Sequence, residues 1–202
     1  MEPAPNMKDY EKEYREFSLP VPEKFSFPID VFDKWGEREA LFWTDGINDK
    51  KLTFTDLKIL SSKGAGALKK IGIGKGDKVL LMLPNIPEWW EVMLALMRLN
   101  AIPIPSTTLL TEKDIEYRLS ATDIKAIISS DEDAAKVEDA INRSLTTPLL
   151  IIVNPPASPL NKGGIKEGYE RQGWHDYIKE RSSADVLEGE RSYSDEPALI
   201  YF

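Results

Sequence analysis

Four short apolar runs constrain the fold of this chain more than any other feature of its sequence. They cover residues 78–83, 101–105, 124–129 and 149–153. The runs do not alternate apolar with polar residues, so both faces of each strand should be buried, which is typical of a parallel sheet. Three segments of helical pattern separate the runs, at 87–99, 111–121 and 131–144. The sequence therefore predicts an α/β fold with a largely parallel sheet flanked by helices and joined by right-handed crossovers.

The order of these patterns divides the chain into four expected parts. Residues 1–27 form an N-terminal extension, 28–154 the α/β subdomain, 155–196 a loop-rich excursion, and 197–202 a further buried strand. The excursion is expected because seven of the nineteen residues from 155 to 173 are Pro or Gly, and so long a stretch of breakers is typical of an insertion or a functional loop.

Local turn and capping signals complete the subdomain. Two short strands, at 40–43 and 51–54, are expected on either side of the Asp45-Gly46 turn. Thr55 is expected to cap the helix that follows and that ends near residue 71. A second start signal is the run from Thr111 to Asp114, which resembles a capping box with Asp in place of Glu.

The first of the three helical segments is apolar on nearly every side. Glu88, Glu91 and Arg98 fall within one narrow sector of a helical wheel, so nearly everything else in the segment is expected to be buried. Trp89 and Trp90 fit either an aromatic ligand platform or the core. Their position inside an apolar helical run favours the core.

The composition excludes several classes of function. The absence of cysteine excludes disulfides, thiolate catalysis and cysteine-ligated metal, and a single histidine, His175, disfavours a histidine-based zinc site or a Ser-His-Asp triad. A net charge of −8 argues against a nucleic-acid partner. No window approaches the ~18 apolar residues of a membrane helix, and residues 1–17 lack the apolar centre of a secretory signal. We therefore expect a cytoplasmic chain without a membrane span.

A glycine cluster at Gly72, Gly74 and Gly76 resembles a phosphate-binding loop only in composition. Such a loop leaves a strand and opens a helix, so that the helix N-terminus meets the phosphate. Here the expected helix precedes the cluster and the expected strand follows it. The cluster is therefore interpreted as a helix C-cap and turn.

One loop is well placed for a ligand. Ser106, Thr107, Thr108, Leu109 and Leu110 follow an expected strand and precede the start of a helix. Ligands of open α/β sheets bind beyond the carboxyl ends of the strands. This loop is the strongest candidate site that the residues alone provide.

The sequence resembles the N-terminal portion of an adenylate-forming (AMP-binding) enzyme, most closely the medium-chain acyl-CoA synthetases and the related acetyl-CoA synthetase-like ligases. The segments that carry the resemblance are LTFTDL at 52–57, the stretch from GIGKGDKVLLMLPNIPEWW through TEKDIEYRL to residue 132, and DEPALIYF at the end of the sequence. The resemblance implies an ATP-dependent ligase that joins a carboxylic acid substrate to CoA, with Mg²⁺ on the ATP. It also implies the fold of that family's N-terminal subdomain.

In that family the ATP-binding loop directly follows a strand like 197–202, and the other catalytic motifs come later. The resemblance therefore assigns no catalytic residue and no metal ligand to this chain. It places Ser106, Thr107, Thr108 and Leu109 beside the CoA channel, where Leu109 stands in place of a polar CoA contact and cannot donate its hydrogen bond. We expect a fragment that is inactive alone, binds no ATP, CoA or Mg²⁺ tightly, and has the remainder of the enzyme as its partner.

Two alternatives of other classes stay open. The loop from Ser106 suits a stand-alone module that binds CoA or an acyl group, or one subunit of a split enzyme. Residues 9–17 fit a short surface helix with Tyr10, Tyr14 and Phe17 on one stripe, which suits an interaction protein or a homo-oligomer. A frayed, solvated tail fits the same residues.

Overall fold

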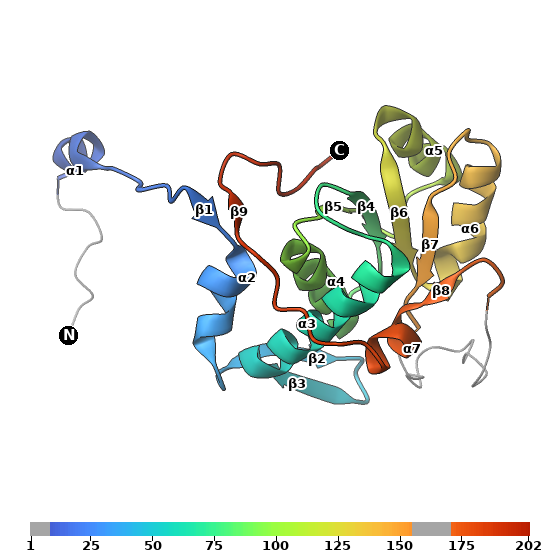
Figure 1. Cartoon of the computed structure of the whole chain (residues 1–202), viewed down its shortest axis with the longest axis horizontal. Coiled ribbons are helices and arrows are strands. Elements are labelled where there is room, and N and C mark those ends of the chain that lie inside the picture. The colour runs from blue at the N-terminus through green and yellow to red at the C-terminus, as the bar shows by residue number, and fades with distance from the viewer. Residues whose placement is uncertain (1–8, 155–170) are drawn as a thin grey trace.

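A computed structural model describes residues 9–154 and 171–202, and its centre is one parallel sheet (Figure 1). The sheet has the strand order β5-β4-β6-β7-β8, and every neighbouring pair is parallel. Its strands are β4 (Lys78–Met82), β5 (Ile102–Pro105), β6 (Ile124–Ser129), β7 (Leu149–Ile152) and β8 (His175–Asp176). The predicted α/β class is confirmed, and the first four strands coincide with the four apolar runs.

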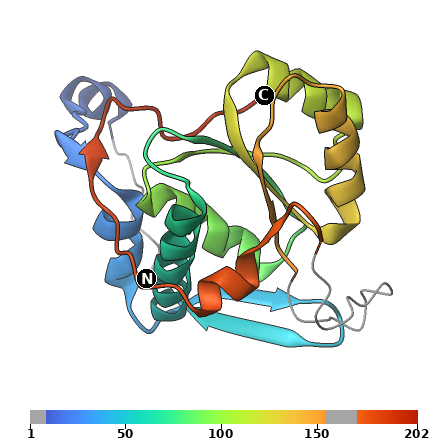
Figure 2. The ribbon, with the colours of Figure 1, turned by 45° about the vertical axis from the view of Figure 1, so that its right-hand side comes forward.

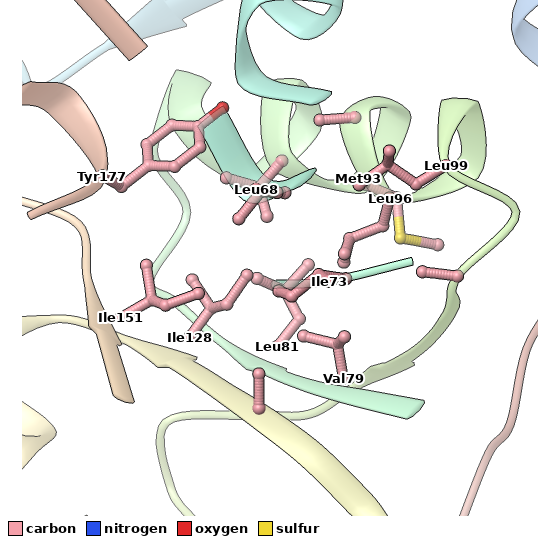
Figure 3. Close-up of a cluster of buried hydrophobic side chains, with 14 of the residues drawn as sticks. Leu68, Ile73, Val79, Leu81, Met93, Leu96, Leu99, Ile128, Ile151 and Tyr177 are labelled. Carbon is pink, nitrogen blue, oxygen red and sulfur yellow. The ribbon is translucent and has the colours of Figure 1, made fainter. Parts of the chain in front are cut away.

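Helices cover both faces of the sheet (Figure 2). They are α3 (Phe54–Ile71), α4 (Pro87–Arg98) and α7 (Tyr177–Ser182) on one face, and α5 (Glu112–Ala121) and α6 (Asp131–Asn142) on the other. Alternate residues of β4 point to opposite faces, so that Leu81 packs toward α3 and α4 while Leu80 packs toward α5 and α6. Figure 3 shows the first of these cores, where Leu68, Leu96 and Ile128 meet. Burial on both faces explains why the runs are continuously apolar.

The other elements lie at the periphery. They are α1 (Tyr10–Glu16), β1 (Lys24–Phe25), α2 (Phe27–Asp30), the 3₁₀ helix η1 (Phe32–Trp35), β2 (Glu39–Thr44), β3 (Asp49–Thr53) and β9 (Ser192–Tyr193). The expected hairpin is confirmed as β2 and β3, and β1 pairs antiparallel with β9. The expected surface helix is confirmed as α1, which stands away from the sheet in Figure 1. Residues 155–170 of the expected excursion lie outside the described residues, and the rest of it contains β8, α7 and β9.

The cap of α3 differs from the prediction. Thr53, not Thr55, is the N-cap: its hydroxyl accepts from the backbone N–H of Asp56 at 3.0 Å, and the Asp56 carboxylate accepts from the Thr53 N–H at 2.8 Å. A capping box needs an acid or amide three residues after the cap, and only Thr53 has one. The box between Thr111 and Asp114 is confirmed.

The glycine cluster has the predicted conformation. Gly72 ends α3 with φ +112°, and its N–H donates to the carbonyls of Leu68 and Lys69. A side chain would be strained at that φ, so glycine is the residue that suits this left-handed C-cap. The interpretation as helix C-cap and turn is confirmed.

The strand expected at 197–202 is absent, although all six residues are described. Only the Ile200 N–H bonds the adjacent strand β5, at 3.2 Å from the Pro103 carbonyl oxygen. Pro103 and Pro105 have no N–H, so this edge of β5 cannot donate the bonds that a ladder requires. Leu199 and Ile200 still pack against the two cores, which explains their apolar character.

The polar sector of α4 is buried rather than exposed. Glu88, Glu91 and Arg98 are each at most 4% exposed. Other elements therefore cover the side of α4 that carries these polar residues. The core interpretation holds for Trp89, which packs against the apolar cluster. It is wrong for Trp90, whose side chain is about half exposed, because one residue further along a helix faces ~100° away.

Candidate functional site

The carboxyl ends of the parallel strands meet at one edge of the sheet. The chain passes from β4 to β5 on one side and from β6 to β7 on the other, so its winding direction reverses between β4 and β6. In open α/β sheets ligands bind at such a reversal, outside the carboxyl ends of the strands. The loop that begins at Ser106 and the Ser129–Ser130 pair lie at this edge, directly after β5 and at the end of β6.

The predicted ligand loop is a short turn with one buried anchor. The Ser106 N–H donates to the Leu81 carbonyl oxygen at 2.9 Å, which extends the pairing of β5 with β4 by one residue. The Thr107 hydroxyl then accepts from the Leu109 N–H at 3.2 Å. Leu110 is buried, whereas the Leu109 side chain is 85% exposed. The turn therefore presents one apolar side chain to solvent.

A lysine from α6 holds the same loop. The Lys136 ammonium donates to the Thr108 carbonyl oxygen at 2.7 Å and pairs with the Asp133 carboxylate at 2.8 Å. This contact joins residues 28 positions apart. Sequence reasoning missed Lys136, because a lysine on a helix has no signal that distinguishes it from a solvated one.

The charges around the start of α6 are paired with one another. Arg171 donates to both carboxylate oxygens of Glu138, at 2.7 and 2.8 Å, and to Asp131 at 3.2 Å. Trp174 donates its indole N–H to Glu138 at 2.8 Å. The Arg171 guanidinium holds the pKa of Glu138 below its usual range. These groups are committed to each other, so this part of the edge offers few free charges to a ligand.

One buried hydroxyl at the edge has no partner among the described residues. The Ser129 side chain is fully buried at the end of β6, and its Oγ makes no hydrogen bond there. It follows Ile128 in the strand, so it points toward the α5 and α6 face. The sequence carries no signal that marks this hydroxyl as unpartnered.

Two clusters of buried polar side chains lie on α4, one around Arg98 and one around Glu91. The sequence pattern did not predict the contacts of either cluster. The Arg98 guanidinium forks onto Asp33 at 2.6 and 3.1 Å, and it also donates to the Ser61 hydroxyl and the Glu188 carbonyl oxygen. We call Arg98 with these three partners the polar clasp. It joins α4 to α3, η1 and the segment after α7.

The second cluster is centred on Glu91, in the second turn of α4. The Tyr177 hydroxyl donates to Glu91 at 2.6 Å, and Arg181 pairs with the other oxygen of the same carboxylate. Burial raises the pKa of Glu91 and that of Tyr177. Both partners come from α7, about 90 residues further along the chain. The cluster fastens α7 to α4.

The structure therefore places the four predicted site residues, Ser106 to Leu109, in one turn at the carboxyl edge. His175 is exposed in β8, as expected for a solvated histidine. Over residues 9–154 and 171–202, no three His, Cys, Asp or Glu side chains are grouped as a metal site would require. No helix in the same ranges has the length and apolar character to cross a bilayer.

This architecture is that of an open α/β domain whose loops collect at a reversal point of the sheet, the class in which nucleotides and other small ligands bind at the carboxyl edge. Residues 30–202 match the AMP-binding enzyme family. The chain belongs to that family.

Its relatives are acyl-CoA synthetases of greater length. The mitochondrial acyl-coenzyme A synthetase ACSM4 of Mus musculus is 35% identical over 195 residues, which is 91% of this chain and 31% of that protein. ACSM5 of Homo sapiens is 36% identical over 199 residues, again 31% of its length. An acyl-CoA synthetase structure from Brucella canis superposes with a TM-score of 0.82 at 21% identity, over 96% of this chain and 36% of that one. The chain thus spans about a third of these relatives.

Proposed function

We propose that this chain is the N-terminal part of an ATP-dependent acyl-CoA ligase. In that reaction a carboxylate attacks the α-phosphorus of ATP and pyrophosphate leaves. The CoA thiol then attacks the acyl-adenylate carbonyl and AMP leaves. The observation that carries the proposal is the AMP-binding match over residues 30–202 in a chain that spans 31% of its acyl-CoA synthetase relatives.

We further propose that the chain is inactive alone. Adenylate formation relies on cations and oriented donors that neutralise phosphate charge. At the carboxyl edge, Lys136 and Arg171 are already bound to Asp133 and Glu138. The described residues also lack a grouped set of metal-ligating side chains. Binding of ATP with Mg²⁺ therefore falls to other parts of a longer enzyme.

A pyrophosphate-release assay tests this proposal. The chain is incubated with ATP, Mg²⁺, CoA and a series of straight-chain carboxylates, and a full-length acyl-CoA synthetase serves as the positive control. We expect no carboxylate-dependent release above the protein-free rate. Turnover that persists in the purified chain, and that requires the carboxylate, overturns the assignment of inactivity.

A second candidate function is a module that binds CoA without catalysis. The observation that favours it is the turn from Ser106 to Leu109, where the Leu109 side chain and Thr107 are exposed at the carboxyl edge and Thr108 is half-buried. These groups suit the neutral pantetheine portion of CoA, and Leu109 offers apolar contact where it cannot offer a hydrogen bond.

Calorimetric titration distinguishes the two functions. A fragment of a larger enzyme is expected to give no saturable heat with CoA in the micromolar range. Saturable micromolar binding that Leu109→Ser and Thr107→Val weaken supports the module instead. Leu145→Ser is the matched control, because Leu145 is fully exposed outside this turn.

A further inference from the structure

The N-terminal arm, residues 9–25, carries an apolar stripe that is exposed among the described residues. Tyr10 and Tyr14 stack with ring centroids 5.9 Å apart, and Phe17 follows at the C-cap of α1. These three side chains are 62–75% exposed, and every residue of α1 is exposed. Residues 9–25 hold six of the twenty exposed large hydrophobic side chains found in the described part of the chain. Such a concentration is typical of an interaction surface.

The arm is anchored at its base and stiff beyond it. β1 pairs with β9, and the Ser194 hydroxyl donates to the Pro22 carbonyl oxygen at 2.6 Å. Pro20 and Pro22 restrict φ between this anchor and α1, which favours an extended segment. Figure 1 shows α1 held out from the body on this segment, well away from α3.

A second surface has the complementary chemistry. It is formed by η1 and the first turns of α3, and we call it the acceptor face. Trp35 and Ile59 are 46% and 50% exposed there, and the Arg38 guanidinium lies 4.8 Å from the Trp35 ring centroid. The basic side chains of the face are Lys34, Arg38, Lys58 and Lys63, and its acids are Glu37, Asp56 and Asp33, which pairs with Lys58 at 3.8 Å. The face is therefore apolar at two points and carries a net charge of +1.

The arm has the opposite charge. Residues 9–16 contain four acids, Asp9, Glu11, Glu13 and Glu16, against Lys12 and Arg15, which gives a net charge of −2. An acidic aromatic helix on a basic apolar face buries the stripe and brings opposite charges together. The anchored arm does not lie on its own acceptor face in this structure, and a second copy offers the same face to it.

We propose that two copies of this chain exchange arms, with α1 of each copy on the acceptor face of the other. A two-fold arrangement makes this contact twice, which doubles the area buried by a seven-residue helix. The proposal concerns association only and does not depend on the ligase assignment.

Sedimentation equilibrium tests the association. The chain is expected to form a reversible dimer, and Tyr10→Ser/Tyr14→Ser/Phe17→Ser is expected to weaken it at least about tenfold, as loss of a cluster of buried aromatic anchors does. Leu145→Ser is the control, since it removes an exposed side chain outside both surfaces. The substituted residues are exposed, so the urea midpoint of each variant should match that of the unsubstituted chain at a concentration low enough for every chain to be monomeric. A chain that stays monomeric at high concentration overturns the proposal, as does a dimer that the triple variant leaves intact.

Cysteine trapping tests the geometry, and the cysteine-free chain makes the result unambiguous. Single variants Tyr14→Cys and Ile59→Cys are mixed in equal amounts and oxidised mildly. We expect the mixed disulfide to exceed both symmetric ones, whereas a mixture of Leu145→Cys with Ile59→Cys gives no such excess. An intramolecular disulfide in the double variant at high dilution, without the mixed dimer, shows an arm that folds back on its own chain and overturns the exchange.

Discussion

The sheet core and the polar clasp stabilise the molecule by different means. The core is apolar, and its strands come from four sequence runs that each contain their own burial pattern. The clasp is a buried guanidinium whose partners lie 37, 65 and 90 residues away in the sequence. Apolar contacts stabilise in proportion to the area removed from water, at about 25 cal/mol per Å², whereas a buried charge stabilises only while it is paired.

This difference indicates which of the two regions tolerates substitution better. A core side chain can lose a methyl group and keep most of its contacts. Arg98 is 1% exposed, and Asp33 faces it with little access to water. Removal of Asp33 leaves Arg98 as an uncompensated buried charge, and removal of Arg98 leaves Asp33 with only the ammonium of Lys58, at 3.8 Å. The clasp is therefore expected to be the more fragile of the two regions.

The largest expected effect is that of Arg98→Met. This variant keeps most of the side-chain volume but removes the two hydrogen bonds that the Arg98 guanidinium donates to the Asp33 carboxylate. We expect a loss of about 3–5 kcal/mol in the free energy of unfolding. Urea denaturation at neutral pH measures it. Ile128→Val on β6 is the comparison from the sheet core, where loss of one methyl group costs about 0.5–1.5 kcal/mol.

The double variant Asp33→Leu/Arg98→Met sharpens the test. Replacement of both charges removes the unpaired group, so part of the stability lost in Arg98→Met should return. Equal losses in Arg98→Met and Ile128→Val contradict the distinction between the two regions. So does a double variant whose loss in the free energy of unfolding exceeds the sum of the losses in its two single variants.

A smaller effect is expected where α7 closes on α3. A Cβ added at Gly64 would lie 2.2 Å from the Tyr177 hydroxyl and 3.2 Å from the Ala95 Cβ. Gly64→Ala should therefore cost about 1–3 kcal/mol through overpacking, as measured by urea denaturation. Gly74→Ala is the matched control, because its nearest neighbour would be the Asp77 carboxylate at an ordinary 3.9 Å.

Tyr177→Phe identifies the cause of that loss. It removes the oxygen that a Cβ at position 64 would strike, so Gly64→Ala should cost less in the Tyr177→Phe background than in the unsubstituted chain. A coupling free energy near zero in this double-mutant cycle indicates that the hydroxyl of Tyr177 is not what limits the space at Gly64.

The same contrast explains what the sequence could predict. The four strands, the Thr111–Asp114 box and the Gly72 cap each follow from residues within a few positions of one another. The clasp does not, since nothing near Arg98 shows that Asp33 and the Glu188 carbonyl will meet it. The strand expected at 197–202 failed for a related reason: its apolar pattern is correct, but the edge it meets contains Pro103 and Pro105.

The candidate site likewise has one part that the sequence predicts and one part that it does not. Its place was predictable, because a loop after an apolar strand reaches the carboxyl edge of a parallel sheet. Its contacts were not, because Lys136 comes from α6 and bonds a backbone oxygen. The unpartnered Ser129 hydroxyl was equally invisible, since a serine at the end of a strand is ordinary in sequence.

The smallest expected effects are in the response to pH, and their signs separate local capping from long-range burial. Hydrogen bonds from the backbone N–H and hydroxyl of Thr111 lower the pKa of Asp114 below its ordinary 3.8. Its contribution is therefore present above pH 3.8 and is lost as the pH falls toward the lowered value. Glu91 is the reverse case, because burial raises its pKa above 4.5. Its contribution is full below pH 4.5 and is lost as the pH rises through the raised value.

Urea denaturation of Asp114→Asn and Glu91→Gln between pH 3 and pH 7 measures both signs. The stability difference between the unsubstituted chain and Asp114→Asn should shrink toward acid. The corresponding difference for Glu91→Gln should move in favour of the unsubstituted chain as the pH is lowered from neutral. Only the slope with pH is diagnostic, because each substitution also changes hydrogen bonding at every pH. If the two stability differences change with pH in the same direction, the pairing of Glu91 with Arg181 outweighs the burial of the Glu91 carboxylate. The buried Glu91 would then respond to pH as the exposed helix cap at Asp114 does.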